Sequence, residues 1–292
     1  MDNYFLFISH DIWEKKVCIE CEEYGVMKEL LKYFSNLIVP FQKGEDNSIN
    51  VRCLKQCLDE YIIYVNDKTV QEKIPRELVL GMIIEIVSSA LVLKNMRLAF
   101  LHGGAVQYNG RTICLVGESH SGKTSLMLSL LKRGWRIGHD DICPIDVRKG
   151  RYVEFFMPLM VRDTGYVDLT ELDTLMQFQT YNMKTQSTET RRIISIFNQR
   201  IAQNASIDVI LHLHRDKNKD YKSVDFQRLD KAFAAKTLAL NNRDPLDPYR
   251  VLKDSLALAS KIPVYHVEYG DAKSLAKLID ENIRRYNCDW QK

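Results

Sequence analysis

Eight consecutive residues constrain the fold of this 292-residue chain more than any other feature. Residues 117–124, GESHSGKT, match the pattern G-x-x-x-x-G-K-S/T, which is the P-loop. The strand-like run TICLV precedes them, and the apolar run SLMLSLL, which has helical spacing, follows them. Because the pattern has meaning only between a strand and a helix, we predict an α/β fold in which this loop joins the two elements.

A loop of this kind predicts binding of a nucleoside triphosphate. Its glycines let backbone N–H groups close around phosphate oxygens, and the N-terminus of the next helix favours negative charge. We expect Lys123 to reach the β- and γ-phosphates and the Thr124 hydroxyl to ligate Mg²⁺, so ATP and Mg²⁺ are the predicted cofactors. The alternative is an accidental glycine-rich loop. The predicted nucleotide-binding residues are Gly117, Glu118, Ser119, His120, Ser121, Gly122, Lys123, Thr124 and Ser125.

A pair of carboxylates follows the predicted helix, at Asp140 and Asp141. Two carboxylates can divide two tasks, because one can hold Mg²⁺ while the other takes a proton from an acceptor hydroxyl. A single Asp would serve a nucleotide hydrolase, so the pair favours a transferase. The alternative is a solvated turn, since Asp is common in turns.

These motifs, in this order, resemble the catalytic domain of HPr kinase/phosphorylase. In that family a His-Gly strand precedes a GES-type P-loop and an Arg-Gly helix end leads to an Asp-Asp pair, as residues 101–104, 117–124 and 133–141 do here. Residues 162–169, RDTGYVDL, are similar to the family's Arg-Gly-x-Gly-x-x-Asp segment. The resemblance covers roughly residues 98–170. It implies an α/β fold with a P-loop, HPr-kinase-like (PEP-carboxykinase-like) catalytic domain.

The chain departs from the family pattern at several positions. His120 and Ser121 stand where the family has Gly-Ile, and Met160 stands where it has a Glu. Residues 261–283 are similar to divergent HPr-kinase-like proteins, which include kinases that phosphorylate serine on ribosomally made peptides such as lasso peptides. The resemblance is therefore to a divergent serine kinase.

The resemblance also implies a role for individual side chains. Thr124 and Asp140 would be the metal ligands, and Asp141 would act on the acceptor hydroxyl, although the two aspartates could exchange roles. His102 would lie near the transferred phosphoryl group, unless it is a satisfied strand histidine. Arg162 would contact the phosphoryl group or the acceptor, unless it forms a surface ion pair.

The predicted function is transfer of the γ-phosphoryl group of ATP to a hydroxyl, a serine on a peptide or small protein. The first alternative is a nucleotide-binding regulatory switch without transfer, and the second is a kinase of a small hydroxylated metabolite. The sequence permits a homo-oligomer. Lys and Arg total 41 against 38 Asp and Glu, which gives no case for nucleic acid or an acidic membrane as a partner.

The N-terminus lacks the basic and apolar regions of a signal peptide, so we expect a cytoplasmic protein. The longest apolar stretch, residues 78–93, contains Glu85, Ser88 and Ser89 and is too short and too polar to cross a bilayer. We predict a buried helix there, beginning near Pro75 and ending near residues 94–95. It would close a small α/β domain at residues 1–96, with a possible role in acceptor recognition, ahead of the catalytic domain at 97–292.

Two cysteine pairs in the first domain have the spacing of zinc ligands, Cys18/Cys21 and Cys53/Cys57. The first pair lies in a strand-like run, and the spacing of four in the second fits one face of a short helix. Structural packing and zinc binding are the two interpretations.

Hydrophobic periodicity and turn residues predict the remaining elements. In the first domain we expect strands at residues 4–8, 16–22 and 61–65 and a helix at 26–37. A hairpin of residues 98–108 and 112–116 would turn at Asn109-Gly110. Further strands are expected at 142–147, 152–156, 207–213 and 264–267, and helices at 125–133, 229–240, 249–260 and 271–286. Residues 177–190 are predicted to be a flexible loop that closes over the site.

The other polar candidates have mainly structural interpretations. His120 is expected to face solvent, and His139 either packs or tunes the Asp pair. His212 and His214 would share one side of a strand, with no carboxylate cluster nearby to support a metal. Arg191 and Arg192 would begin a solvated helix or bind an anionic substrate.

Overall fold

The computed structural model describes residues 3–9, 16–35, 37–40, 48–57, 59–92, 98–162, 179–184, 190–196, 198–243 and 247–284. The chain divides into two compact units, each assembled from three segments. Unit 1 comprises Met1–Asn95, Met157–Thr164 and Phe178–Ser195, and unit 2 comprises Met96–Phe156, Gly165–Gln177 and Ile196–Lys292. The structure therefore groups two later segments with unit 1, whereas the sequence assigns all of residues 97–292 to one domain.

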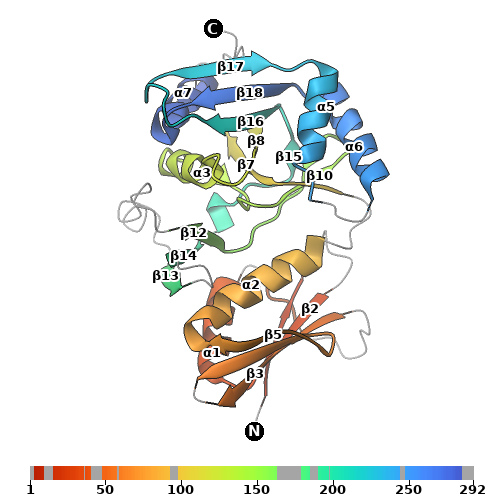
Figure 1. The fold of residues 1–292 in the computed structure, drawn as a ribbon, viewed down its shortest axis with the longest axis vertical. Coiled ribbons are helices and arrows are strands. Elements are labelled where there is room, and N and C mark those ends of the chain that lie inside the picture. Colours follow the sequence, from red (N-terminus) through yellow and green to blue (C-terminus); the bar gives the residue numbers. More distant parts are fainter. Residues whose placement is uncertain are drawn as a thin grey trace. The chain divides into compact units, whose positions relative to one another are not determined.

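A five-stranded sheet in the order β1-β2-β3-β4-β5 forms most of unit 1 (Figure 1). Strands β2 and β3 are parallel, and the other neighbours are antiparallel. The helices that pack with it are α1 (Tyr24–Tyr33) and α2 (Arg76–Val92). The strands are β1 (Tyr4–Ile8), β2 (Lys16–Cys21), β3 (Ser48–Cys57), β4 (Glu60–Val65) and β5 (Lys68–Pro75).

Helix α2 is the buried helix that the longest apolar stretch predicts. It begins directly after Pro75, a residue suited to the start of a helix. Its side chains at Val79, Ile83 and Val87 are fully buried. Within the described residues, no helix is long and apolar enough to cross a membrane.

The helix predicted around Cys53 and Cys57 is wrong, because both residues lie in strand β3. Positions four apart share a face of a strand as well as of a helix, so the spacing alone does not separate the two. A bulge between Lys55 and Cys57 then breaks the alternation, so that Cys53 is buried and Cys57 is exposed. Cys53 lies beside Cys21 of β2 in the parallel register.

Three antiparallel strands of unit 1 lie in the second half of the chain, in the order β12-β14-β13. They are β12 (Leu159–Arg162), β13 (Gln179–Lys184) and β14 (Thr190–Ser195). The prediction of a loop over residues 177–190 is wrong for residues 179–184, which form β13. This polar edge strand pairs through its backbone with β14. Residues 177–178 and 185–189 lie outside the described residues. Arg191 and Arg192 belong to this central strand β14 and not to a helix start.

Unit 2 contains a six-stranded sheet in the order β17-β18-β16-β8-β7-β9. Strand β16 is parallel to both neighbours, β18 and β8. The hairpin β7–β8 turns at Asn109 and Gly110, whose φ angles of 48° and 75° fit the type I′ turn predicted for Asn-Gly. The strands are β7 (Gly103–Tyr108), β8 (Arg111–Val116), β9 (Arg136–Ile137), β16 (Val209–Arg215), β17 (Val224–Arg228) and β18 (Val264–Tyr269).

The run expected as one strand at residues 98–108 is divided between two sheets. Its first part, β6 (Ala99–Leu101), joins a four-stranded antiparallel sheet in the order β15-β11-β10-β6. That sheet also contains β10 (Cys143–Asp146), β11 (Arg151–Tyr152) and β15 (Ala205–Ser206), so the strand predicted at 152–156 ends at Tyr152. The break falls at His102, directly before Gly103, where a Cβ would collide with the carbonyl oxygen of Leu115. The chain therefore changes sheets at a predicted site residue.

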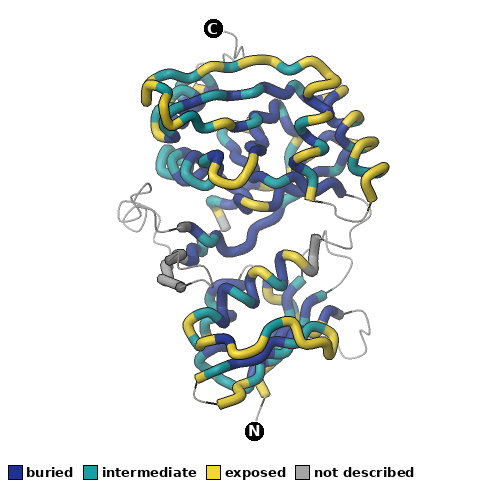
Figure 2. The backbone as a smooth tube through the Cα atoms, in the orientation of Figure 1, coloured by how far each residue is buried: buried dark blue, intermediate teal, exposed yellow. Residues whose placement is uncertain are grey.

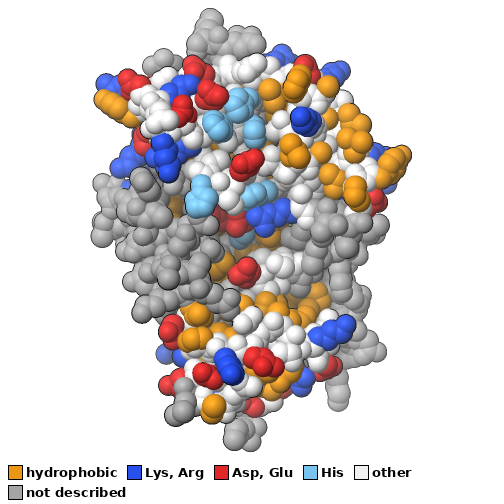
Figure 3. All heavy atoms as spheres, viewed as in Figure 1, with side chains coloured by type: hydrophobic (Ala, Val, Ile, Leu, Met, Phe, Trp, Pro, Cys, Tyr) orange, Lys and Arg blue, Asp and Glu red, His pale blue; other side chains and the backbone are white. Residues whose placement is uncertain are grey.

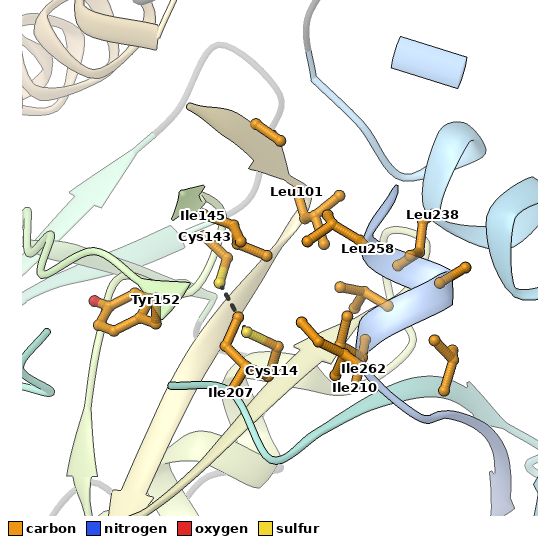
Figure 4. Packing of buried hydrophobic residues seen from close by; sticks show 14 of the residues in the cluster. Leu101, Cys114, Cys143, Ile145, Tyr152, Ile207, Ile210, Leu238, Leu258 and Ile262 are labelled. Atoms are coloured by element: carbon orange, nitrogen blue, oxygen red, sulfur yellow. Dashed lines mark hydrogen bonds between the residues drawn. The ribbon is translucent and has the colours of Figure 1, made fainter. Parts of the chain in front are cut away.

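The helices of unit 2 follow the predicted positions to within a few residues. They are α3 (Lys123–Lys132), α5 (Lys231–Leu240), α6 (Pro248–Lys261) and α7 (Ala272–Arg284), with one 3₁₀ turn, η1 (Asn198–Arg200). Helix α3 packs against α7, and α5 packs against α6. Side chains of α5 and α6, such as Leu238 and Leu258, cover Cys114 of β8 and Ile210 of β16 (Figure 4). Buried residues in both units concentrate along the sheets and the helix sides packed on them (Figure 2).

Candidate functional site

Residues 117–122 join β8 to α3, as the sequence predicts. Gly122 caps the N-terminus of α3 with φ 89°, in the left-handed region that glycine adopts at least cost. A Cβ at Gly122 would collide with the Tyr269 hydroxyl, and a Cβ at Gly117 would lie 2.7 Å from Ser121 Oγ. The loop therefore requires glycine at both ends, which is the reason for the spacing in the motif.

Lys123 lies across the inside of this loop. Its Nζ donates to the carbonyl oxygens of Gly117 at 2.8 Å and Glu118 at 3.0 Å. Burial lowers the pKa of Lys123, and the nearby charges of Asp141 and Asp140 act in the opposite direction. Among the described residues no carboxylate forms an ion pair with this ammonium group, so a buried positive charge faces the loop.

Thr124 connects the loop to the carboxylate pair. Its Oγ1 donates to Asp140 Oδ2 at 2.5 Å. Asp140 is buried, and burial, together with the charge of Asp141, raises the pKa of its carboxyl group. The first turn of α3 and the segment after β9 thus meet at one hydroxyl–carboxylate contact.

Asp141 has a different environment from that of its neighbour. Its side chain is 56% exposed, with Oδ1 lying 3.2 Å from His102 Nε2 and 3.7 Å from Arg243 Nη2. Partial burial acts to raise the pKa of Asp141, but the hydrogen bond with His102, followed by electrostatic contributions from His139 and Arg243, outweighs it and holds the pKa well below its usual range. Two adjacent carboxyl groups therefore have pKa values displaced in opposite directions.

The backbone holds His102 and Arg243 beside Asp141. The N–H of His102 donates to Asn241 O at 2.6 Å, and the N–H of Arg243 donates to Phe100 O at 2.8 Å. Asn241 follows the last residue of α5. The end of β6 and the end of α5 are thereby joined at the site.

His139 supports the segment that carries the aspartates. Its Nδ1 accepts from the backbone N–H groups of Asp141 at 3.2 Å and Ile142 at 3.1 Å. Burial lowers the pKa of His139, which fits a neutral ring whose Nδ1 acts as an acceptor. Of the two interpretations of this residue, the structure shows a packed side chain that fixes the backbone of the Asp pair.

Two residues of the site were missed by sequence reasoning. Tyr269, the last residue of β18, donates its hydroxyl to the Ser121 carbonyl at 2.5 Å. Arg243 follows α5 in a stretch that matches no motif. Tyr269 reaches the loop through the pairing of β18 with β16, and Arg243 reaches Asp141 through its backbone contact with Phe100, so no local pattern could have marked either residue.

The remaining loop positions have simpler settings. Glu118, Ser119 and His120 are exposed, as predicted for His120, which has φ 68°. Ser125 lies in the first turn of α3, where its carbonyl accepts from Ser129 Oγ. Ser121 Oγ is buried and has no hydrogen-bond partner among the described residues.

The structure describes the backbone of Arg162 but not its side chain. Arg162 ends β12 of unit 1, where its backbone lies opposite Arg191 of β14. Most of the segment that resembles the family's Arg-Gly-x-Gly-x-x-Asp motif, residues 163–169, lies outside the described residues. The predicted role of Arg162 stays a prediction.

The histidines of β16 lie beside a third histidine on β18. His212 Nδ1 is 3.0 Å from His266 Nδ1, and the rings of His214 and His266 have centroids 5.9 Å apart. Burial, then the neighbouring His266 and His214, lower the pKa of His212 to about 4. In the described part of the chain, no group of three or more His, Cys, Asp or Glu side chains is arranged to hold a metal, the two cysteine pairs included.

Comparison with known proteins found matches among solved structures. No family model matches the chain, and no curated protein matches it. Among solved structures, the chain is similar to the Hpr(Ser) kinase/phosphatase from Coxiella burnetii. That similarity has a TM-score of 0.30 and 11% sequence identity, and covers 64% of this chain and 89% of the other. A similarity of this size transfers neither a site residue nor an activity to this chain.

Proposed function

We propose that this chain is a Mg-ATP-dependent kinase that transfers the γ-phosphoryl group to a serine hydroxyl of a peptide or small protein. The observation that most supports the proposal is the division between the two aspartates. Asp140 is buried against Thr124, while Asp141 is half-exposed beside His102 and Arg243. Displaced pKa values in neighbouring titratable groups are typical of sites where each group has its own task.

The loop fits a triphosphate group. The Lys123 ammonium is buried and bound only to two loop carbonyls among the described residues, so an anion would neutralise it. The Ser121 hydroxyl, which has no hydrogen-bond partner in the described part of the chain, lies in the same loop. The N-terminus of α3 adds backbone donors and a favourable dipole.

Thr124 and Asp140 fit a magnesium ion. Proteins bind Mg²⁺ through one or two side-chain oxygens, with phosphate oxygens and water completing the octahedron. A hydroxyl and a carboxylate that already contact each other provide such a pair. When bound, Mg-ATP supplies the γ-phosphoryl group and the cation neutralises part of its charge.

Asp141 would then orient the acceptor hydroxyl and receive its proton. Its low pKa makes it a weak base, so positioning matters more than proton abstraction until the acceptor oxygen has begun to bond to phosphorus. His102 fixes the Asp141 carboxylate, and the half-exposed Arg243 places a positive charge beside it. Lys123 would hold the phosphates in line.

The experiment is transfer of label from γ-labelled ATP with Mg²⁺ to a panel of serine peptides, with the purified chain and two variants. We expect label on a peptide only with the unmutated chain. Lys123→Met should abolish nucleotide binding. Asp141→Asn should retain nucleotide binding and lose transfer by about a hundredfold or more. Tight nucleotide binding without transfer to any peptide would overturn the proposal of a peptide kinase in favour of a switch or of a kinase of a small hydroxylated metabolite. Undiminished transfer by Asp141→Asn would remove the role of that residue.

A further inference from the structure

The outward faces of α5 and α6 carry large apolar side chains. Five of the six large exposed hydrophobic residues described in unit 2 lie on these two helices, and Tyr221 is the other one. Figure 3 shows hydrophobic side chains gathered over the two helices, at the upper right of the view. The five, with their exposed fractions, are Phe233 61%, Leu240 77%, Tyr249 77%, Leu252 50% and Leu256 51%.

Each helix therefore has two apolar stripes. Helix α5 buries Ala234, Ala235 and Leu238 in the core, and α6 buries Leu258 and Ala259. A surface helix of a globular protein needs only one apolar stripe, facing the core. On α6 the second stripe contains Tyr249, Leu252 and Leu256, at positions i, i+3 and i+7. On α5 it contains Phe233 and Leu240, at positions i and i+7. Exposed apolar area organised in this way marks an interaction surface.

The charges beside these stripes are positive. Lys236 lies three residues after Phe233 on α5, Lys253 lies four residues after Tyr249 on α6, and both lysines are exposed. The acidic residue within the helices, Asp254, forms an ion pair with Arg250 at 3.5 Å. The side chains of Asp230 and Asp247 cap the helix N-termini. A second copy of the same face would bring lysine against lysine, so the charge favours an acidic occupant.

The surface leads directly to the proposed phosphotransfer site. Helix α5 ends at Leu240, the most exposed of its apolar residues, and Asn241 then accepts the hydrogen bond from the N–H of His102. Two residues later, Arg243 lies 3.7 Å from Asp141. A segment bound along α5 would be held next to the carboxylate that faces the acceptor.

We infer that the exposed faces of α5 and α6 are a docking surface for an acidic amphipathic helical segment of the polypeptide that carries the acceptor serine. This inference rests on the proposed kinase function and names the chemistry of its substrate. Apolar side chains of the segment cover the two stripes, and its carboxylates pair with Lys236 and Lys253. Docking of this kind follows the helix-in-groove mode, with anchors at i, i+3, i+4 and i+7.

The test uses fluorescently labelled peptides of about 18 residues, or five helical turns, with anisotropy as the measurement. One peptide has leucines at the anchor positions and glutamates elsewhere, a second has lysines in place of the glutamates, and a third has the first composition in scrambled order. We expect the acidic amphipathic peptide to bind at least about tenfold more tightly than the other two. The double variant Leu240→Ser/Leu252→Ser should lose about tenfold or more of that affinity, because exposed apolar anchors dominate such interfaces.

Two further variants complete the design. Tyr221→Ser removes an equally exposed aromatic residue outside the helices and should leave the affinity unchanged. The double variant Lys236→Glu/Lys253→Glu should bind the acidic peptide more weakly and the basic peptide more tightly. Equal affinity for acidic and basic peptides, or full affinity in the leucine variant, would overturn the inference. Self-association that the leucine variant abolishes would also overturn it, since it would assign the surface to a second copy.

Failure of the docking inference is distinguishable from failure of the kinase proposal. Peptide binding is measured without nucleotide, and nucleotide binding is measured without peptide. The leucine variant should bind a fluorescent ATP analogue as the unmutated chain does. Loss of peptide binding with intact nucleotide binding concerns the docking surface alone. Failure to bind nucleotide, with peptide binding intact, overturns the kinase proposal and with it the identity of the docked segment as substrate.

Discussion

At the scale of single residues, two adjacent aspartates have opposite properties, because burial dominates at Asp140 and polar contacts dominate at Asp141. Asp140 is buried with a raised pKa, and the half-exposed Asp141 has a lowered one. In the sequence they are two identical letters, so the motif could predict the pair but could not divide the tasks between its members. Burial of Asp140 on one side and the contact of Asp141 with His102 on the other make that division.

Asp140→Asn is expected to stabilise the nucleotide-free protein at neutral pH. When folding raises the pKa of a carboxyl group, the folded protein loses stability as the pH rises from the unfolded-state pKa through the folded-state pKa. The full loss of stability remains at higher pH. Asparagine removes that penalty and can still accept the hydrogen bond from Thr124. Urea unfolding should show a higher midpoint for the variant at pH 7 and a vanishing difference below about pH 4.

The control is Asp141→Asn, for which we expect the opposite change in stability. The pKa of Asp141 is lowered on folding, so its ionised form stabilises the protein above the unfolded value. This variant should be less stable than the unmutated chain at pH 7. The same direction of change in both variants would contradict the opposite environments described above.

His120 is expected to strain the loop. Its φ of 68° lies in the left-handed region, which costs a residue with a Cβ about 1 kcal/mol or more. His120→Gly and His120→Ala both remove the imidazole, and differ in tolerance of this φ. The glycine variant should be more stable than the alanine variant by about 1 kcal/mol in urea unfolding, and equal stability of the two would contradict strain at this position.

At the scale of elements, local patterns predicted the parts of the fold that local sequence decides. The strand β8, the loop and α3 follow one another as the P-loop motif requires, and the Asn109-Gly110 hairpin forms at its predicted turn. The wrong predictions share a cause, which is long-range pairing. Strand β13 is polar and becomes a strand only because β14 pairs with it, and β3 is shifted by a bulge against β4.

Tyr269→Phe is expected to loosen the loop from β18. The tyrosine hydroxyl donates to the Ser121 carbonyl, and a buried neutral hydrogen bond of this kind contributes about 1 kcal/mol. The variant should unfold at lower urea and bind a fluorescent ATP analogue more weakly. Tyr265→Phe, on the same strand, is the matched control and should alter neither property, while unchanged nucleotide affinity in Tyr269→Phe would show that the contact does not position the loop.

At the scale of the whole molecule, each unit is built from three separated segments of chain. Composition and periodicity could indicate where the first 95 residues end, because a long apolar helix closes them. They could not assign residues 157–164 and 178–195 to unit 1, because that assignment depends on contacts such as those between α2 and β13.

A fragment of residues 96–292 is therefore expected to fold poorly. It retains β12, β13 and β14 but lacks α2, against which β13 packs. We expect it to unfold with a lower and broader thermal transition than the full chain and to be cleaved by protease within residues 157–195. A fragment with the midpoint and protease resistance of the full chain would show that this sheet is independent of the first 95 residues.

Removal of metal ions is expected to stop phosphotransfer without unfolding the chain. Thr124 and Asp140 fit an ion bound together with nucleotide, and the described cysteines are not gathered into a zinc site. EDTA should abolish transfer while circular dichroism and the unfolding midpoint stay unchanged, and excess Mg²⁺ should restore transfer. Cooperative unfolding on chelation would instead indicate a structural metal.

The segmental construction of unit 1 has a consequence for synthesis on the ribosome. When residues 1–95 have emerged, the five-stranded sheet and both of its helices are available, but the strands β12, β13 and β14 have not yet been made. Because the last of them ends at Ser195, unit 1 reaches its final composition only after the whole of β8, the loop and α3 has been translated. The segment from β8 to α3 is thus released before unit 1 has received all of its strands, so the folding of the two units overlaps in time.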